Sequence, residues 1–89
     1  MLGTVQVANG NFYYCLMRKK DSLKILLGSN IKFYRAKHGF TQEDFSERIE
    51  CDVKYLSDVE NGWFYPSSEF LLKVIQVLEV PVALLFTQR

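Results

Sequence analysis

Residues 41–62 carry two short runs of apolar positions at helical spacing, with almost no room for a loop between them. Apolar side chains recur in both runs: Phe45 and Ile49 in the first, Tyr55, Leu56 and Val59 in the second. Thr41 and Asp52, which precede the two runs, are residue types that cap helix N-termini, and Asn61-Gly62 ends the second run. The pattern predicts two helices joined by a turn of three or four residues, and such helices must cross steeply.

A longer helix is predicted before this pair. Asp21 or Ser22 can cap its N-terminus. The helix should run to about Lys37, and Gly39 should end it. Apolar residues three and four positions apart predict one buried face, made of Leu23, Leu27, Ile31 and Tyr34.

Two more helices are predicted after the pair. Ser67 or Ser68 caps the first of them, and Pro81 begins the second, which is short. The first has a broad apolar face that consists of Phe70, Leu71, Val74, Ile75 and Leu78. A final apolar cluster of Leu84, Leu85 and Phe86 should close the core. The expected fold class is therefore mainly α, with five helices.

The N-terminal residues 4–17 have the pattern of a β-hairpin instead. Asn9-Gly10 signals a two-residue turn, because both central positions of such a turn need positive φ. One face of the hairpin would carry Val5, Val7, Phe12, Tyr14 and Leu16. Since an isolated hairpin is marginally stable in water, this face should rest either on the helices or on a second subunit. In the second case, the candidate dimer contacts are Val5, Val7, Phe12 and Tyr14.

The small net charge of +1 conceals a strong difference between the two halves of the chain. Residues 1–40 contain seven Lys and Arg residues against one acid, whereas residues 41–89 contain four against nine acids. The first half includes the basic connector Arg18-Lys19-Lys20 and could attract phosphate groups. We expect residues 1–20 to form the hairpin and this connector, and residues 21–89 to form one helical domain.

Composition excludes several classes of protein. A chain of 89 residues with 48% hydrophobic content should form one core. No apolar run approaches the roughly 18 residues that a membrane span needs, and the N-terminus lacks a signal-peptide pattern. Cys15 and Cys51 form no CxxC motif, which fits a reducing cytoplasm. With His38 as its one histidine, the sequence suggests neither a metal nor a cofactor.

A steeply crossed pair of this kind is a helix-turn-helix, whose second helix can enter the major groove of DNA. At about 100° per residue, the side of that helix opposite its apolar residues holds Val53, Lys54, Ser57, Asp58 and Asn61. Val53 could touch a thymine methyl group, Lys54 could donate to guanine or a phosphate, and Asp58 could accept from cytosine. Lys54 and Asp58, four residues apart, could also pair with each other. A solvated helix surface explains the same pattern equally well.

The start of the first helix of the pair offers a second contact, because free N–H groups at a helix N-terminus suit a phosphate. Gln42 could hold that phosphate or brace Lys54. Glu43 and Asp44 in the same turn indicate instead that the helix dipole is satisfied from within.

Three blocks of residues form a spaced pattern from residue 22 to residue 87, about three-quarters of the chain. The first block is Leu27-Gly28, Ile31, Tyr34-Arg35 and Gly39-Phe40-Thr41-Gln42. The second is Phe45-Ser46, Ile49, Tyr55-Leu56-Ser57, Val59-Glu60 and Gly62. The third is Pro66-Ser67, Leu71, Lys73-Val74, Leu78, Val80 and Leu85-Phe86. In these positions the chain resembles the lambda-repressor-like family of DNA-binding domains, often called XRE-type helix-turn-helix regulators.

The resemblance implies a role for individual residues. The base-reading positions of the family and its adjacent phosphate-contacting positions correspond to Val53, Lys54, Ser57 and Asp58. Gln42 corresponds to a phosphate-holding position, and the loop after the motif implies contacts with the sugar-phosphate backbone through Asn61, Trp63 and Tyr65. Thr41 and the basic Lys32 complete the candidate backbone contacts. Arg35 and Glu60 correspond to a structural pair between the first helix and the end of the third, and a homodimer on a two-fold operator is implied.

The chain also departs from the family pattern. Glu50 stands at a turn position that is often Gly, so a positive φ there would cost about 1 kcal/mol. Residues 41–62 contain seven acids and two bases, and the predicted hairpin does not belong to the common domain.

Two functions of different classes fit these features. The first is a sequence-specific DNA-binding transcriptional regulator. The second is a protein-interaction module on the same fold, such as an antitoxin-like or anti-repressor partner, which the acid-rich motif and the aromatic segment Trp63-Phe64-Tyr65 favour. We do not expect an enzyme, because one histidine and scattered carboxylates supply no nucleophile–base pair.

Overall fold

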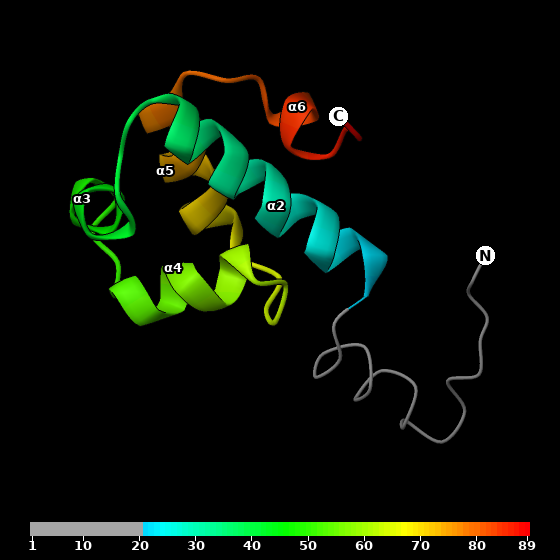
Figure 1. Cartoon of the computed structure of the whole chain (residues 1–89), viewed down its shortest axis with the longest axis horizontal. Helices are drawn as coiled ribbons and strands as arrows, with labels where there is room; N and C mark the ends of the chain where they lie inside the picture. Colours follow the sequence, from blue (N-terminus) through cyan, green and yellow to red (C-terminus); the bar gives the residue numbers. More distant parts are fainter. Residues whose placement is uncertain (1–20) are drawn as a thin grey trace.

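The computed structural model describes residues 21–89, in which the elements are α-helices joined by turns and loops. The helices are α2 (Ser22–Lys37), α3 (Gln42–Arg48), α4 (Val53–Glu60), α5 (Ser68–Leu78) and α6 (Val82–Leu85) (Figure 1). The predicted helical fold is therefore confirmed for the described part of the chain. The predicted hairpin lies outside the described residues, and so do its candidate dimer contacts Val5, Val7, Phe12 and Tyr14.

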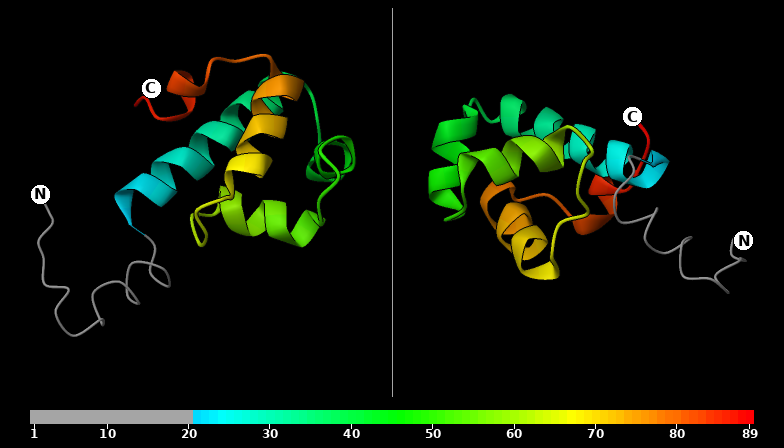
Figure 2. Two further views of the ribbon diagram at one scale, coloured as in Figure 1. Left: turned by 180° about the vertical axis from the view of Figure 1, so that it is seen from behind. Right: turned by 90° about the horizontal axis from the view of Figure 1, so that it is seen from below.

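The longest helix, α2, organises the domain. It packs against α4, α5 and α6, while α3 packs against α4. In Figure 1, α4 lies along the lower edge of the helical domain and α3 lies at one end of it. Seen from behind, α5 meets the C-terminal end of α2 and diverges from it at an angle (Figure 2). Helix α4 thus rests on α2, and α3 rests on α4.

Side-chain caps begin four of the five described helices. The capping residues are Asp21 for α2, Thr41 for α3, Asp52 for α4 and Ser67 for α5. Each accepts a hydrogen bond from a backbone N–H of the first turn, as expected for these residue types. Pro81 precedes α6 and makes no such bond. The predicted helix starts are therefore confirmed, and the two open choices fall on Asp21 and Ser67.

Positive φ angles mark the breaks between helices. Gly39 has φ 79° after α2, and Gly62 has φ 85° after α4. Glu50 has φ 58° in the turn between α3 and α4, which confirms the strain expected there. Glu79 has φ 56° where α5 ends, a strained position that the sequence did not indicate.

The core gathers the apolar faces of all five described helices. Its buried apolar side chains are Leu27, Ile31, Phe45, Ile49, Leu56, Val59, Phe70, Val74, Leu78 and Leu85. Two predictions were wrong, because Leu23 is 47% exposed and Leu84 is 37% exposed. Leu23 lies in the first turn of α2 and Leu84 in the single turn of α6. Helical spacing identifies the apolar side of a helix but not how far along the helix the core extends.

A buried asparagine ties the C-terminal residues to α2. Asn30 is fully buried, and its Nδ2 donates to the backbone oxygens of Leu85 at 2.8 Å and Thr87 at 3.0 Å. Its Oδ1 accepts from Nε of Arg89 at 3.0 Å, and the Arg89 guanidinium lies 4.2 Å from the ring centroid of Phe33. These bonds satisfy the Asn30 amide and hold the end of α6 against the middle of α2.

Candidate nucleic-acid interface

The turn between α3 and α4 sets the angle of the helix pair. Phe45 on α3 and Leu56 on α4 are both fully buried, so the core holds both helices. Between them, Cys51 N donates to Ser46 O at 2.9 Å, and the Asp52 side chain accepts from the backbone N–H of Lys54. The left-handed conformation of Glu50 makes this short connection possible.

The side of α4 that faces away from the core carries the predicted reading residues. Val53 is 38% exposed and Lys54 is exposed, whereas Ser57 and Asp58 are partly buried. Nζ of Lys54 lies 3.4 Å from Oδ2 of Asp58, so the predicted pair between these two side chains is present. Four side chains of different chemistry thus share one accessible surface, while their contact with DNA stays a prediction.

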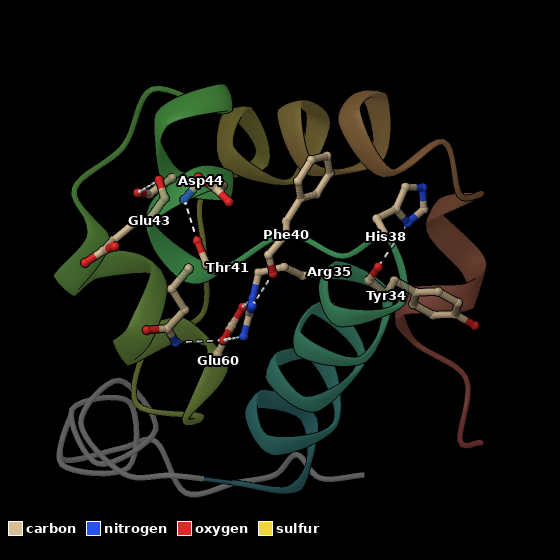
Figure 3. Close-up of polar contacts among 10 residues, drawn as sticks. Tyr34, Arg35, His38, Phe40, Thr41, Glu43, Asp44 and Glu60 are labelled. Atoms are coloured by element: carbon tan, nitrogen blue, oxygen red, sulfur yellow. Dashed lines mark hydrogen bonds and ion pairs between the residues drawn. The ribbon is translucent and has the colours of Figure 1, made fainter.

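A buried ion pair joins α2 to the end of α4 (Figure 3). Arg35 Nε donates to Glu60 Oε2 at 2.6 Å, and Arg35 Nη2 donates to Glu60 Oε1 at 3.0 Å. Arg35 Nη1 also donates to the backbone oxygen of Phe40 at 2.7 Å. The Glu60 side chain is only 1% exposed, so the two charges compensate each other away from water. The structural pair that the resemblance implied is therefore present, and Arg35 is committed to Glu60 rather than exposed for a phosphate contact.

The side chain of Gln42 joins the same cluster. Gln42 is the first residue of α3, and its Nε2 donates to Glu60 Oε1 at 2.9 Å. The alternative expectation that Gln42 braces Lys54 was therefore wrong, because the amide reaches the nearby anionic oxygen instead. The neighbouring Thr41 is exposed, and its Oγ1 accepts from the backbone N–H of Asp44 at 3.0 Å.

A glycine in α2 allows α4 to approach closely. A Cβ atom at Gly28 would meet the backbone oxygen of Val59, and it would lie 2.7 Å from that of Glu60. Both oxygens belong to the last turn of α4. The resemblance included Gly28 without assigning it a role, although a glycine inside a helix often indicates close packing.

The loop after α4 presents aromatic side chains. Trp63 is 47% exposed and Tyr65 is 47% exposed, and Asn61 at the C-cap of α4 is exposed as well. Phe64 stacks on Tyr55 of α4, with 6.4 Å between the ring centroids. On α2, Lys32 is exposed. The candidate backbone contacts thus come from α2, from the start of α3 and from the loop.

Cys51, in the turn, shows the chemistry of a sheltered thiol. Partial burial, followed by the nearby charge of Asp52, raises the pKa of Cys51, and Lys73 opposes this effect. Within residues 21–89, no group of His, Cys, Asp and Glu could hold a metal ion. In the same part of the chain, no helix is long and apolar enough to cross a membrane.

Comparisons with known proteins agree with this geometry. A family model described as helix-turn-helix matches residues 31–85. The HTH-type transcriptional regulator SinR of Bacillus licheniformis is 35% identical over 65 residues, which cover 72% of this chain and 59% of SinR. The chain thus spans less than two thirds of the length of this relative.

Two solved structures share the fold. The clp gene regulator ClgR of Corynebacterium glutamicum has a TM-score of 0.69 and 31% identity, over 75% of this chain and 71% of ClgR. The restriction-modification controller protein C.AhdI of Aeromonas hydrophila has a TM-score of 0.67 and 25% identity, over 71% of this chain and 96% of C.AhdI. Since the family model matches more than half of the chain and includes all of α3, α4 and α5, the chain belongs to the XRE-type helix-turn-helix family.

Proposed function

We propose that this chain is a sequence-specific DNA-binding transcriptional regulator that acts as a dimer on a two-fold operator. The observation that carries the proposal is the outward side of α4, which is accessible in a helix pair held firmly by the core. The regulators SinR, ClgR and C.AhdI, which the chain resembles, support the same function. We expect no catalysis, and a chain that binds chromosomal DNA would act in the cytoplasm.

In this proposal α4 lies in the major groove. Val53 would contact a thymine methyl group, Lys54 would donate to guanine or to a phosphate, and Ser57 would donate or accept. An exposed ion pair contributes little free energy, so Lys54 can leave Asp58 at small cost. Asp58 would then accept from a cytosine amino group. These four side chains would supply the base contacts, and Asp58 would disfavour sequences that offer it no donor.

The phosphate backbone would contact three parts of the domain. The candidates are Thr41 and Gln42 at the start of α3, Asn61, Trp63 and Tyr65 in the loop, and Lys32 on α2. Phosphate contacts fix the position of a protein on DNA but carry no sequence information directly. They would therefore place α4 in register with the bases.

The proposed dimer follows from the two-fold operators that such domains commonly bind. Its candidate contacts are the apolar side chains Val5, Val7, Phe12 and Tyr14 of the N-terminal segment. Two copies of α4 would then meet successive half-sites about 34–36 Å apart.

Selection of bound sequences from random duplexes, run beside sedimentation, tests the proposal. We expect recovery of an inverted repeat, a dimer in sedimentation and an affinity that falls steeply as salt rises. A chain that binds no duplex even at low salt would contradict the proposed function. A monomer that recovers a single half-site would contradict only the dimer.

A protein-interaction module is the second candidate. The exposed aromatic side chains of the loop, Trp63, Phe64 and Tyr65, favour it because such groups often mark partner sites. The salt titration separates the two functions. A partner bound through these rings would keep its affinity at salt concentrations that abolish DNA binding.

A further inference from the structure

The Glu60 carboxylate has two different kinds of donor. Arg35 reaches it with two N–H groups, at 2.6 and 3.0 Å, and balances its charge. Gln42 reaches it with one N–H of a neutral amide at 2.9 Å. The bonds from Arg35 already balance the charge of the Glu60 carboxylate, so the bond from Gln42 is not needed to compensate that charge. The bond instead fixes the position of the Gln42 side-chain amide.

We propose that Glu60 is a positioning residue that orients the side-chain amide of Gln42 towards a DNA phosphate. This inference rests on the proposed function, and it adds a role for a residue that does not itself reach the DNA. The Glu60 side chain is 1% exposed, so it can act on DNA only through another group. Gln42, which is partly exposed, is that group.

The chemistry of the amide fixes its orientation. A carboxylate only accepts hydrogen bonds, so the nitrogen of the Gln42 amide, and not its oxygen, must face Glu60. One N–H of this nitrogen is bonded to Glu60, and the second points away from that bond at about 120°, as planar amide geometry requires. Within residues 21–89, the Gln42 amide has no other hydrogen-bond partner. The second N–H can therefore donate to a phosphate oxygen without any rearrangement.

The same contact couples the phosphate position to the reading helix. Glu60 ends α4 and Gln42 begins α3. Arg35 bonds to Glu60 and to the carbonyl of Phe40, two residues before α3 (Figure 3). A shift of α4 along its axis would move the Glu60 carboxylate and turn the Gln42 amide with it. The phosphate contact should thus form only when α4 is correctly seated.

A double-mutant cycle on the full chain tests the inference. Gln42→Ala removes the amide, and Glu60→Asp keeps the charge but withdraws the carboxylate from Gln42. We measure the affinity for the selected duplex for the wild type, both single variants and the double variant, at a temperature where circular dichroism shows each one to be folded. Gln76→Ala on α5 and Glu69→Asp on α5 are matched controls at exposed positions, and neither should change the affinity.

We expect each single substitution to weaken binding about tenfold, the effect of one hydrogen bond to a charged group. Because Glu60 acts through Gln42, Glu60→Asp should have almost no further effect in the Gln42→Ala background. A purely structural role predicts the same loss in both backgrounds, about a hundredfold for the double variant, and this result would overturn the inference. If Glu60→Asp does not fold, Glu60→Gln replaces it, because it keeps the side-chain length and one acceptor for Arg35.

Failure of the proposed function gives a different result. A wild type that binds no duplex at low salt would remove both the function and the inference. A wild type that binds, together with losses that multiply in the double variant, would leave the function standing and remove only the positioning role of Glu60.

Discussion

Substitution of Gly28 by Ala should destabilise the domain although it improves the helix. In an open helix interior, Ala is more favourable than Gly by about 1 kcal/mol. Here the new Cβ would lie 2.7 Å from the Glu60 oxygen and would overlap the Val59 oxygen, whereas ordinary contacts begin at 3.4 Å. To relieve the contact with the Glu60 oxygen alone, α4 would have to move away from α2 by about 0.7 Å. This movement would stretch the ion pair between Arg35 and Glu60.

The overlap should outweigh the helix propensity. Overpacking typically costs 1–3 kcal/mol, and here the groups that must move are backbone oxygens rather than flexible side chains. With the strained ion pair added, we expect Gly28→Ala to lower the free energy of unfolding by about 2 kcal/mol or more. Urea denaturation followed by the fluorescence of Trp63, the one tryptophan of the chain, measures this change.

Gly39→Ala is the matched control. Gly39 has φ 79°, and a Cβ atom there would meet no atom within 4 Å, so only the backbone strain of about 1 kcal/mol applies. A Gly28→Ala variant as stable as the wild type, or more stable, would refute the close approach of α4 to α2. A loss no larger than that of Gly39→Ala would mean that α4 adjusts freely.

Four further substitutions test separate parts of the structure. Lys54→Ala should cost about 1–3 kcal/mol of binding and relax specificity at one base step in a panel of single-base operators, whereas a uniform loss with a smaller salt slope would assign Lys54 to a phosphate. Asp58→Asn should strengthen binding to random duplex by roughly 1 kcal/mol in a competition assay, because a charge that repels phosphate is lost; unchanged random binding would contradict this. Glu50→Gly should raise the free energy of unfolding by up to about 1 kcal/mol, and with it the urea midpoint, because it relieves a positive φ and loses only an exposed ion pair. A lower midpoint would show that the ion pair outweighs the strain. Asn30→Ala should lower stability by about 2–3 kcal/mol in the same denaturation assay, since it leaves two backbone oxygens unpaired, and a near-neutral result would mean that water replaces the amide.

Local sequence signals were sufficient for the helices and their boundaries. Capping side chains lie two or three residues from the backbone N–H groups that they bond, so Thr41 and Asp52 could be recognised without knowledge of the fold. The same holds for the outward side of α4, because apolar spacing within eight residues defines the core direction. The strain at Glu50 was predictable from the resemblance, because Glu50 stands at a turn position where the family often has Gly.

Contacts between helices could not be predicted in the same way. The bond from Gln42 to Glu60 joins residues 18 positions apart, and those from Asn30 to the C-terminal residues span 55 positions or more. A polar residue inside an apolar stripe indicates that it has a partner but not which one. The exposure of Leu23 was missed for a related reason, since the extent of the core along α2 depends on the lengths of other helices.

The acidity of the helix pair, which in the sequence opposes DNA binding, is largely compensated within the fold. Glu60 pairs with Arg35 from α2, Glu50 lies 3.7 Å from Nζ of Lys73 on α5, and Asp58 pairs with Lys54. Asp52 caps α4, and both Glu43 and Asp44 lie in the first turn of α3, where the helix dipole favours negative charge. Two of the compensating cations come from outside residues 41–62, so a count of charge within that segment overstates the repulsion that a phosphate would meet. Asp58 is the acid that lies on the outward side of α4, and its partner Lys54 is the residue that DNA would draw away. DNA binding therefore leaves the Asp58 carboxylate without its partner in the groove. On the proposed function, only a base that donates a hydrogen bond to this carboxylate replaces the lost interaction.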